Sequence, residues 1–288
     1  MKDLNYQLKQ LCNQNRDGSY STQSARRHIL GQIASQLHGL GYRGMNVRSL
    51  KPKHVESLVE HWLRHDIAVG TIKNRMTCLR WWAGKVNRSN VVARSNDHYG
   101  IPNRQFVTAE SKAQSVNEQA LAKVRDSYVR MSLELQQAFG LRREEAIKFR
   151  PDFADRGDHI ELKPSWTKGG KSRHIPIVTS AQRDTLNKAH KLTGKGSLIP
   201  GGKNYVQQLR VYERHTANAG LSRLHGLRHA YAQARYLALT GWPSPAAGGV
   251  KTIDLGIQER QIDHEARLVI SHELGHIRKQ IVSVYLNR

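Results

Sequence analysis

HIELK, residues 159–163, is the one convincing β-strand in this sequence, because apolar and polar side chains alternate along it. Residues 172–178 form a second extended stretch, which contains Pro176. KGGK, residues 168–171, lies between the two stretches and predicts a hairpin turn, since glycine adopts positive φ without strain. The sequence therefore predicts one small antiparallel sheet.

On both sides of this hairpin in the sequence, apolar residues recur at the spacing of amphipathic helices. Helices are expected over residues 117–149 and again from Thr179 onward. Nearer the N-terminus, helices are expected over residues 21–40, from Pro52, and from Thr71, which can cap the third helix. The expected fold class is therefore mainly α with a small antiparallel β-sheet.

The sequence also predicts two domains. Residues from about 88 to 107 lose helical periodicity and contain Gly100 and Pro102, which predicts a linker. We expect a helical domain over residues 1–105, which includes this linker, and a second domain over residues 106–288.

The chain is strongly basic. Its 288 residues include 46 Lys and Arg against 23 Asp and Glu, which gives a formal net charge of +23. A protein this basic usually binds a polyanion, and nucleic acid is the commonest one. Lys73, Arg75 and Arg80 lie between the apolar positions of the third helix and are expected to contact DNA phosphates, although the same pattern also fits a solvated face.

Other features narrow the class of protein. Cys12 and Cys78 form neither a metal-binding nor a disulfide pattern, so free thiols in a reducing cytosol are expected. The N-terminus has no apolar signal segment, and no stretch approaches the ~18 apolar residues of a membrane span. We therefore expect a cytoplasmic protein without a membrane partner.

Four short motifs follow one another in the second domain. They are GLRREE (residues 140–145), the hairpin KGGKSRHIP (168–176), HGLR (225–228) and LGH (274–276), and a tyrosine, Tyr285, follows nine residues later. The pattern H-x-x-R alone means little, because it also occurs at residues 61–64 and 264–267. All four motifs in this order, around a hairpin in a helical chain, are hard to obtain by chance.

This order resembles the catalytic domain of the tyrosine recombinases over roughly residues 108–288, and most of all the integrases of phages and integrating mobile elements. The N-terminal helices are similar to the core-binding domain of that family. The resemblance implies a two-domain clamp around double-stranded DNA and a homotetramer on DNA, with room for accessory DNA-bending factors. It also implies a bacterial host cell, with the protein near the nucleoid.

The resemblance implies site-specific recombination through a 3′-phosphotyrosine intermediate, without metal, ATP or any cofactor. Arginine forks match phosphate oxygens and stay charged, so Arg142 and Arg228 are expected to hold the phosphate. Tyr285 is the expected nucleophile, and because its free pKa is about 10 it needs a neighbouring base. His225 is expected to take or orient the tyrosine proton, since it shares a helix face with Arg228.

Further residues complete the expected site. His276 is expected to hydrogen-bond the phosphate, and Lys168 at the hairpin tip to protonate the leaving 5′ oxygen. Glu145 is expected to orient an arginine, although an exposed helix acid fits its position equally well. Lys171 and Arg173 of the hairpin are expected to contact DNA.

Two features depart from the family pattern. Residues 237–265 make the chain before LGH longer than expected and include a Gly/Pro-rich piece, so we interpret them as an inserted loop that touches DNA or a partner subunit. Only three residues follow Tyr285, which leaves open how protomers interlock. So near the chain end, Tyr285 is expected to be mobile and outside the pocket when no DNA is bound.

Other functions have to be weighed. HELGH, residues 272–276, fits the zinc-protease pattern H-E-x-x-H with Glu273 as base. No third ligand follows it, and an upstream ligand such as His264 would be unusual. A DNA-binding protein without catalysis would use the same fold, yet every expected catalytic position is filled. A topoisomerase is disfavoured by the small size and the N-terminal helical domain.

Overall fold

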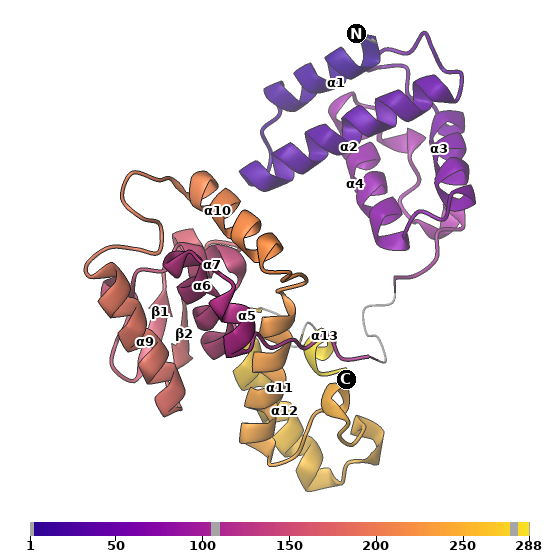
Figure 1. Ribbon diagram of the computed structural model, residues 1–288. Coiled ribbons are helices and arrows are strands. Elements are labelled where there is room, and N and C mark those ends of the chain that lie inside the picture. Colours follow the sequence, from indigo (N-terminus) through magenta and orange to yellow (C-terminus); the bar gives the residue numbers. More distant parts are fainter. Residues whose placement is uncertain (1–2, 105–109, 277–281, 288) are drawn as a thin grey trace. The chain divides into compact units, whose positions relative to one another are not determined.

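The computed structural model describes residues 3–104, 110–276 and 282–287 (Figure 1). The chain separates into two compact units, Met1–Gln105 and Phe106–Arg288. Both consist mainly of helices, and the second also holds a two-stranded antiparallel sheet, which confirms the expected fold class. None of the helices in the described ranges is long and apolar enough to cross a membrane.

The first unit is a group of helices around α2. Its elements are α1 (Asp3–Gln14), α2 (Tyr20–Gly39), α3 (Pro52–Arg64), α4 (Val69–Lys85) and the 3-10 helices η1 (Ser89–Val91) and η2 (Asp97–Tyr99). Helix α2 packs against α1, α3 and α4. The buried indoles of Trp62 and Trp82 donate hydrogen bonds to Gln36 at 2.9 Å and to the Val47 carbonyl at 2.8 Å. Thr71 does not cap α4, which begins two residues earlier.

The predicted linker is wrong over residues 88–104. Val91, Val92 and Ile101 are buried in the core of the first unit. The side chain of Arg80 also donates hydrogen bonds to this segment. The prediction is wrong because these apolar residues are buried one by one and do not recur at a helical spacing. The rest of the predicted linker lies outside the described residues.

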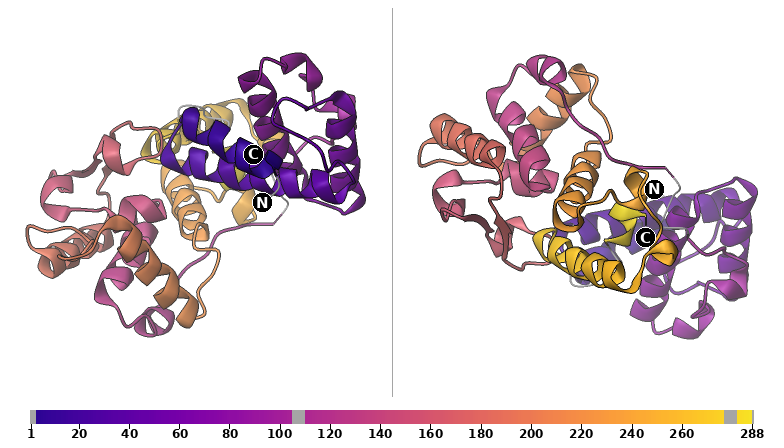
Figure 2. Two further views of the ribbon diagram at one scale, coloured as in Figure 1. Left: turned by 90° about the horizontal axis from the view of Figure 1, so that it is seen from above. Right: turned by 90° about the horizontal axis from the view of Figure 1, so that it is seen from below.

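The second unit is built around α11. In chain order its elements are α5 (Glu118–Ala122), α6 (Ser127–Phe139), α7 (Arg143–Ile147), α8 (Pro151–Ala154), β1 (His159–Leu162), η3 (Pro164–Trp166), β2 (Arg173–Pro176), α9 (Ser180–Thr193), α10 (Tyr205–Asn218), α11 (Gly226–Thr240), η4 (Pro245–Ala247), η5 (Thr252–Asp254), α12 (Ile257–Glu273) and α13 (Ser283–Leu286). Helix α11 packs against α6, α12 and α13, and the views in Figure 2 show α11 and α12 side by side.

The predicted hairpin is confirmed, with shorter strands than expected. His159 pairs with Pro176, and Leu162 pairs with Arg173. The connection between the strands is longer than a tight turn, because it contains η3. Trp166 of η3 is buried and anchors this connection in the core of the unit.

The expected insertion at residues 237–265 is helical at both ends. Helix α11 continues to Thr240 and α12 begins at Ile257, so only residues 241–256 form the irregular part. Within it, η4 packs against α13, the helix that carries Tyr285. This segment therefore helps to form the surroundings of the C-terminal helix.

The variant Gly140→Ala tests the close packing between the end of α6 and α11. Gly140 has a φ of +59°, and a Cβ atom there would lie 2.5 Å from Cδ1 of Tyr231. Backbone strain and overpacking both act on this variant, so we expect the free energy of unfolding to fall by about 2–4 kcal/mol. Urea denaturation measures this loss.

Gly169→Ala is the matched control for that variant. Gly169 has a φ of +92°, but a Cβ atom there would meet nothing within 4 Å. Only backbone strain then remains, and the expected loss is about 1 kcal/mol. Equal losses in the two variants would contradict the packing argument for Gly140.

Candidate active site

The N-terminal half of α11 carries Arg228, the most buried of the arginines that the sequence motifs of the second unit contain. Arg228 is 1% exposed. Its guanidinium donates hydrogen bonds to the carbonyls of Gly140 and Leu274 and, at 3.4 Å, to the hydroxyl of Tyr285. Burial and then the charge of Arg142 lower the pKa of Arg228 to about 10, so Arg228 stays protonated at neutral pH.

His225 stands at the start of the same helix, as its N-cap residue. Partial desolvation, followed by the charges of Arg228 and Arg142, holds the pKa of His225 below its ordinary value of 6.5. The ring centroids of His225 and Tyr285 are 6.0 Å apart. A neutral imidazole therefore faces the tyrosine.

Arg142 reaches the same place from a different element. Gly140 ends α6 in the left-handed conformation, and Arg142 is the N-cap residue of α7. The Arg142 guanidinium donates hydrogen bonds to Glu145 at 2.8 Å and to the Leu274 carbonyl at 3.3 Å. Because Arg228 also donates to that carbonyl, one acceptor holds two guanidiniums close together.

A fully buried carboxylate balances these cations. Glu145 is 0% exposed and accepts hydrogen bonds from Arg173 at 2.7 and 2.6 Å, in addition to that from Arg142. Burial alone would raise the pKa of Glu145, but the hydrogen bonds and charge of Arg173, with the charges of Arg142 and Arg228, lower it to about 2. The alternative of an exposed helix acid is therefore wrong.

The position of Arg173 contradicts its prediction as a DNA contact. Its side chain is 6% exposed, and both terminal nitrogens bind Glu145. As the first residue of β2, Arg173 joins the hairpin to α7. The sequence motifs do not reveal this ion pair, because its two residues are 28 positions apart.

His276 follows the tight turn that ends α12. Gly275 has a φ of +63°, and a Cβ atom there would lie 2.9 Å from Cδ of Arg173, so the turn needs glycine. Burial, followed by the charge of Arg228, lowers the pKa of His276 to about 3. Its buried Nε2 has no hydrogen-bond partner among the described residues. A buried ring nitrogen without a partner calls for an explanation, and a hydrogen bond to a ligand oxygen would supply one.

The same turn argues against a zinc-protease helix. Helix α12 ends at Glu273, so His272 and His276 do not lie on successive turns of one helix. Glu273 instead accepts hydrogen bonds from Tyr231 at 2.7 Å and from Arg235 at 2.9 Å. In the part of the chain that the structure describes, no group of three or more His, Cys, Asp and Glu residues is placed to hold a metal ion.

Tyr285 lies inside this group of side chains and is 5% exposed. Three imidazoles surround its ring, with centroid distances of 4.6 Å to His229, 5.6 Å to His276 and 6.0 Å to His225. The expectation that Tyr285 lies outside the pocket is therefore wrong for this structure. Its neighbour Leu286 is fully buried and anchors α13 in the core, despite the nearby chain end.

His229 is a residue of the site that the sequence analysis does not single out. It is 4% exposed, and its Nδ1 has no hydrogen-bond partner among the described residues. Burial, followed by the charges of His225 and Lys112, lowers its pKa to about 4. Its spacing of four residues from His225 is the feature that could have identified it, because this spacing puts both imidazoles on one helix face.

The structure places Lys168 and Lys171 on the connection between the strands, where both are exposed. Gly169 and Gly170 have φ values of +92° and +66°, which confirms the predicted glycine turn. Lys168 thus lies on the surface and not within the buried group around Tyr285.

The three predicted DNA contacts of the first unit differ in their surroundings. Lys73 is half-buried and donates a hydrogen bond to Asn103 at 3.3 Å. Arg80 is half-buried and binds the segment after α4. Arg75 is only 9% exposed and lies over the ring of Trp62 at 5.2 Å, so the prediction that it belongs to an exposed basic face is wrong.

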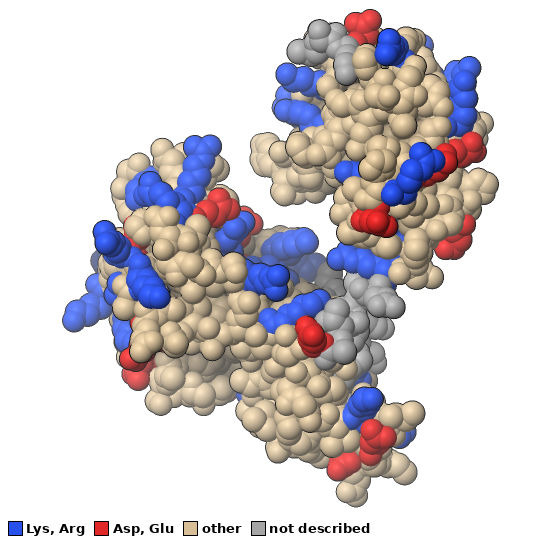
Figure 3. All heavy atoms as spheres, turned by 45° about the vertical axis from the view of Figure 1, so that its right-hand side comes forward, with Lys and Arg blue, Asp and Glu red and all other residues tan. Residues whose placement is uncertain are grey.

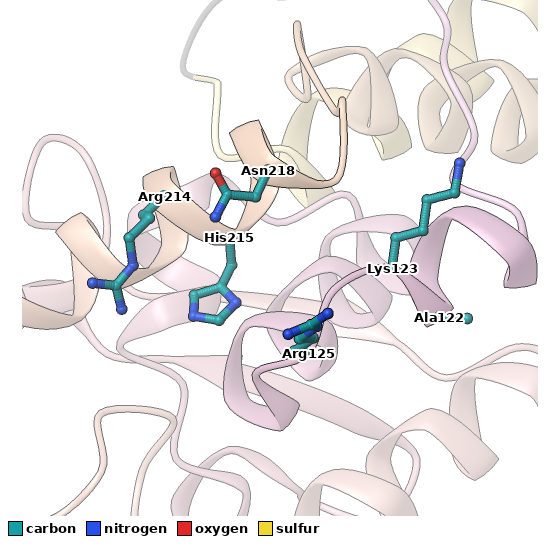
Figure 4. A pocket seen from close by; sticks show the side chains of 6 residues that line it. All are labelled: Ala122, Lys123, Arg125, Arg214, His215 and Asn218. Carbon is teal, nitrogen blue, oxygen red and sulfur yellow. The ribbon is translucent and has the colours of Figure 1, made fainter.

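A further basic group lines a pocket between α10 and the connection from α5 to α6. Figure 4 shows its lining residues, which are Ala122, Lys123, Arg125, Arg214, His215 and Asn218. None of these described residues is acidic. Lys and Arg side chains are also spread over the visible face of each unit (Figure 3). Exposed cations of this kind suit contacts with phosphates.

Comparison with known families gives two matches in chain order. The family model "Phage integrase, N-terminal" matches residues 1–89, and the model "Integrase" matches residues 103–234. No curated protein sequence matches this chain.

Several solved structures are similar over nearly the whole chain. A lambda integrase dimer bound to a COC′ core site has a TM-score of 0.60 at 15% identity, covering 98% of this chain and 94% of that one. The XerH recombinase bound to a palindromic difH substrate has a TM-score of 0.60 at 16% identity, with coverages of 98% and 80%. The Tn1549 transposon integrase in complex with circular intermediate DNA has a TM-score of 0.53 at 12% identity, with coverages of 97% and 94%.

At these identities the structural likeness shows the fold, which is that of the tyrosine recombinases. The two family matches agree with it and cover most of both units. The chain belongs to the phage integrase family of tyrosine-type site-specific recombinases.

The variant Glu145→Gln should destabilise the protein strongly at neutral pH. It leaves the buried Arg173 guanidinium without a compensating charge, which costs about 3–5 kcal/mol of unfolding free energy. Glu144→Gln is the matched control, because Glu144 is 50% exposed in its ion pair with Lys148 and should change stability little. Urea denaturation at several pH values measures both effects.

The pH dependence of the Glu145 variant has a definite sign. The pKa of Glu145 is about 2 in the folded chain, below its ordinary value of 4.5. The ionised carboxylate therefore stabilises the fold above pH 4.5, and this contribution is lost as the pH falls from 4.5 towards 2. Stability should fall more steeply in this window for the wild type than for Glu145→Gln. Equal slopes would contradict the role of this ion pair.

Proposed function

We propose that this protein cleaves and rejoins double-stranded DNA at specific sites through a 3′-phosphotyrosine intermediate at Tyr285. The observation that carries the proposal is the position of the Tyr285 hydroxyl, 3.4 Å from Nε of Arg228. A second guanidinium, that of Arg142, is held beside Arg228, and the buried Nε2 of His276 is without a partner among the described residues. This arrangement suits an anionic phosphodiester.

The two arginines retain donors for a phosphate. A guanidinium has five N–H donors, of which Arg228 uses three and Arg142 two in the bonds described above. The remaining donors can bind the phosphate oxygens, on which negative charge accumulates as the pentacoordinate state forms. Stabilisation by preorganised charge is therefore the main contribution proposed for Arg142 and Arg228.

In the proposed cleavage step, the oxygen of Tyr285 attacks phosphorus while the bond between phosphorus and O5′ breaks. The tyrosine proton passes to the neutral imidazole of His225, and the leaving 5′ oxygen receives a proton from Nζ of Lys168. The exposed Lys168 would make this approach once DNA is bound. Rejoining is the reverse reaction with a new 5′ hydroxyl, so the phosphodiester energy is conserved without ATP.

The proposed reaction needs no metal ion. Divalent ions in other phosphoryl-transfer sites neutralise charge on the phosphate oxygens. In this site the guanidiniums of Arg142 and Arg228 and the ammonium of Lys168 supply that charge. His276 adds a hydrogen bond from its side chain.

Double-stranded DNA is the proposed partner of both units, with the first as core-binding domain and the second as catalytic domain. The net charge of +23, the exposed Lys171 and the basic pocket around Arg125 and Arg214 support contacts with phosphates. Similar solved structures include a lambda integrase dimer on a core site and a lambda integrase tetramer on a Holliday junction. They support assembly of several copies of this chain on DNA.

The variant Tyr285→Phe should bind DNA normally and form no covalent adduct, because the ring stays while the nucleophilic oxygen is lost. Arg142→Ala and Arg228→Ala should each slow adduct formation about 10²-fold or more. A denaturing gel with a nicked suicide substrate measures the adduct.

Tyr128→Phe on α6 is the control for that experiment and should form the adduct at the wild-type rate. An adduct formed by Tyr285→Phe would assign the nucleophile to another residue. The wild-type adduct should also form in excess EDTA, and its loss on chelation would contradict the mechanism without metal.

The acid limb of the cleavage reaction should lie below pH 6.5, the ordinary pKa of histidine. The lowered pKa of His225 keeps the base neutral to lower pH, and activity is lost as the pH falls through that pKa. Rates of adduct formation at subsaturating DNA report on groups of the free enzyme. His225→Gln should abolish this limb, and its persistence would exclude His225 as the base. DNA affinity of Tyr285→Phe over the same pH range is the control.

A further inference from the structure

Gln233 connects α11 to the main chain of Tyr285. It lies four residues after His229, on the same helix face, and is 9% exposed. Its side-chain nitrogen donates a hydrogen bond to the backbone carbonyl of Tyr285 at 3.1 Å. A carbonyl can only accept, so this bond fixes the orientation of the amide. Helix α11 thus contacts Tyr285 at its ring through His229, at its hydroxyl through Arg228 and at its main chain through Gln233.

The same amide also meets the segment with which the second unit begins. The hydroxyl oxygen of Ser111 lies 3.0 Å from Nε2 and 3.3 Å from Oε1 of Gln233. It also accepts a hydrogen bond from the backbone N–H of Ala113 at 3.2 Å. Ser111 therefore contacts the same amide that bonds the Tyr285 carbonyl, across 122 positions of sequence.

This segment is itself fixed against the start of α11. The backbone N–H of Gln114 donates to the carbonyl of Gly226 at 3.0 Å. A Cβ atom at Gly226 would lie 2.6 Å from the carbonyl oxygen of Lys112, so this close approach needs glycine. Ser111 is consequently part of a braced segment and not of a free loop.

We propose that Gln233 is a positioning residue for Tyr285 and that Ser111 fixes the amide through which it acts. The inference rests on the proposed function, in which Tyr285 attacks DNA. Helix α13 has only 4 residues, and so short a helix has little stability of its own. The bond from Gln233 restrains its main chain, so that the tyrosine hydroxyl stays beside Arg228.

The attack on phosphorus makes such a restraint necessary. A displacement of a reacting atom by about 1 Å can cost about 10²-fold in rate. The contact between the Tyr285 hydroxyl and Arg228 is 3.4 Å long, which is a weak hydrogen bond. This contact alone does not hold the nucleophile, whereas the bond to its main chain does not depend on the hydroxyl that reacts.

Two variants of Gln233 test the proposal. Gln233→Ala removes the amide, and Gln233→Glu keeps its shape but cannot donate to a carbonyl when ionised. In single-turnover reactions with saturating nicked suicide substrate, both should form the Tyr285 adduct about tenfold more slowly than the wild type, with unchanged DNA affinity. Ser111→Ala should slow the reaction about threefold, and Ser111→Thr, which keeps the hydroxyl, should restore the wild-type rate.

Gln182→Ala is the matched control. Gln182 is also buried, and its amide donates to the carbonyl of Ala138 at 2.9 Å, but it lies on α9. The variant loses this hydrogen bond and those that Gln182 accepts from the N–H groups of Val178 and Thr179. It should still keep the wild-type adduct rate at a temperature at which every variant is folded.

The outcomes separate the two levels of inference. Equal adduct rates in the wild type and both Gln233 variants would overturn the positioning role and leave the proposed function intact. Absence of a Tyr285 adduct in the wild type would overturn the proposed function itself. An equally slow Gln182→Ala would overturn the positioning role, because general loss of stability would then set the rate.

Discussion

The buried carboxylate of Glu145 is the interaction on which the rest of the site depends. The buried guanidiniums of Arg173 and Arg228 converge with the half-buried guanidinium of Arg142, and like charges repel strongly when they are buried. Glu145 binds two of these cations directly, and its pKa is lowered by all three. One acid therefore compensates cations that come from the hairpin, the start of α7 and α11. A fold without this acid would leave the buried arginines without a compensating charge, which is strongly destabilising.

The residue types of the site could be predicted, because phosphate chemistry requires arginines, imidazoles and a nucleophile at short, recognisable spacings. His225 and Arg228 illustrate this, since three positions on one helix suffice to place both side chains. Contacts between distant parts of the chain could not be predicted in this way. Arg173 and Glu145, or Ser111 and Gln233, have no periodic relation, so only the folded chain shows that they pair.

The secondary structure also divides into features that local sequence patterns predict and features that they do not. Helical periodicity correctly predicted α2 and α3, and alternation with a glycine turn predicted the hairpin. Isolated buried residues, such as Val91 and Ile101 in the predicted linker, have no periodic spacing that would reveal their burial. The position of Tyr285 is a second example. Its place near the chain end predicts a tyrosine outside the pocket, but the residue is buried. One buried neighbour, Leu286, outweighs that tendency.

The carbonyl of Leu274 acts on the two arginines through the main chain alone. It accepts hydrogen bonds from both Arg142 and Arg228, and so holds the two guanidiniums beside each other. This acceptor belongs to the main chain, so no side-chain substitution can remove it. Alanine substitutions in the LGH motif would change the packing of the leucine side chain but would leave the carbonyl and its hydrogen bonds to the arginines in place. Only a change in the backbone itself, such as an ester in place of the amide between Leu274 and Gly275, would weaken this carbonyl as a hydrogen-bond acceptor.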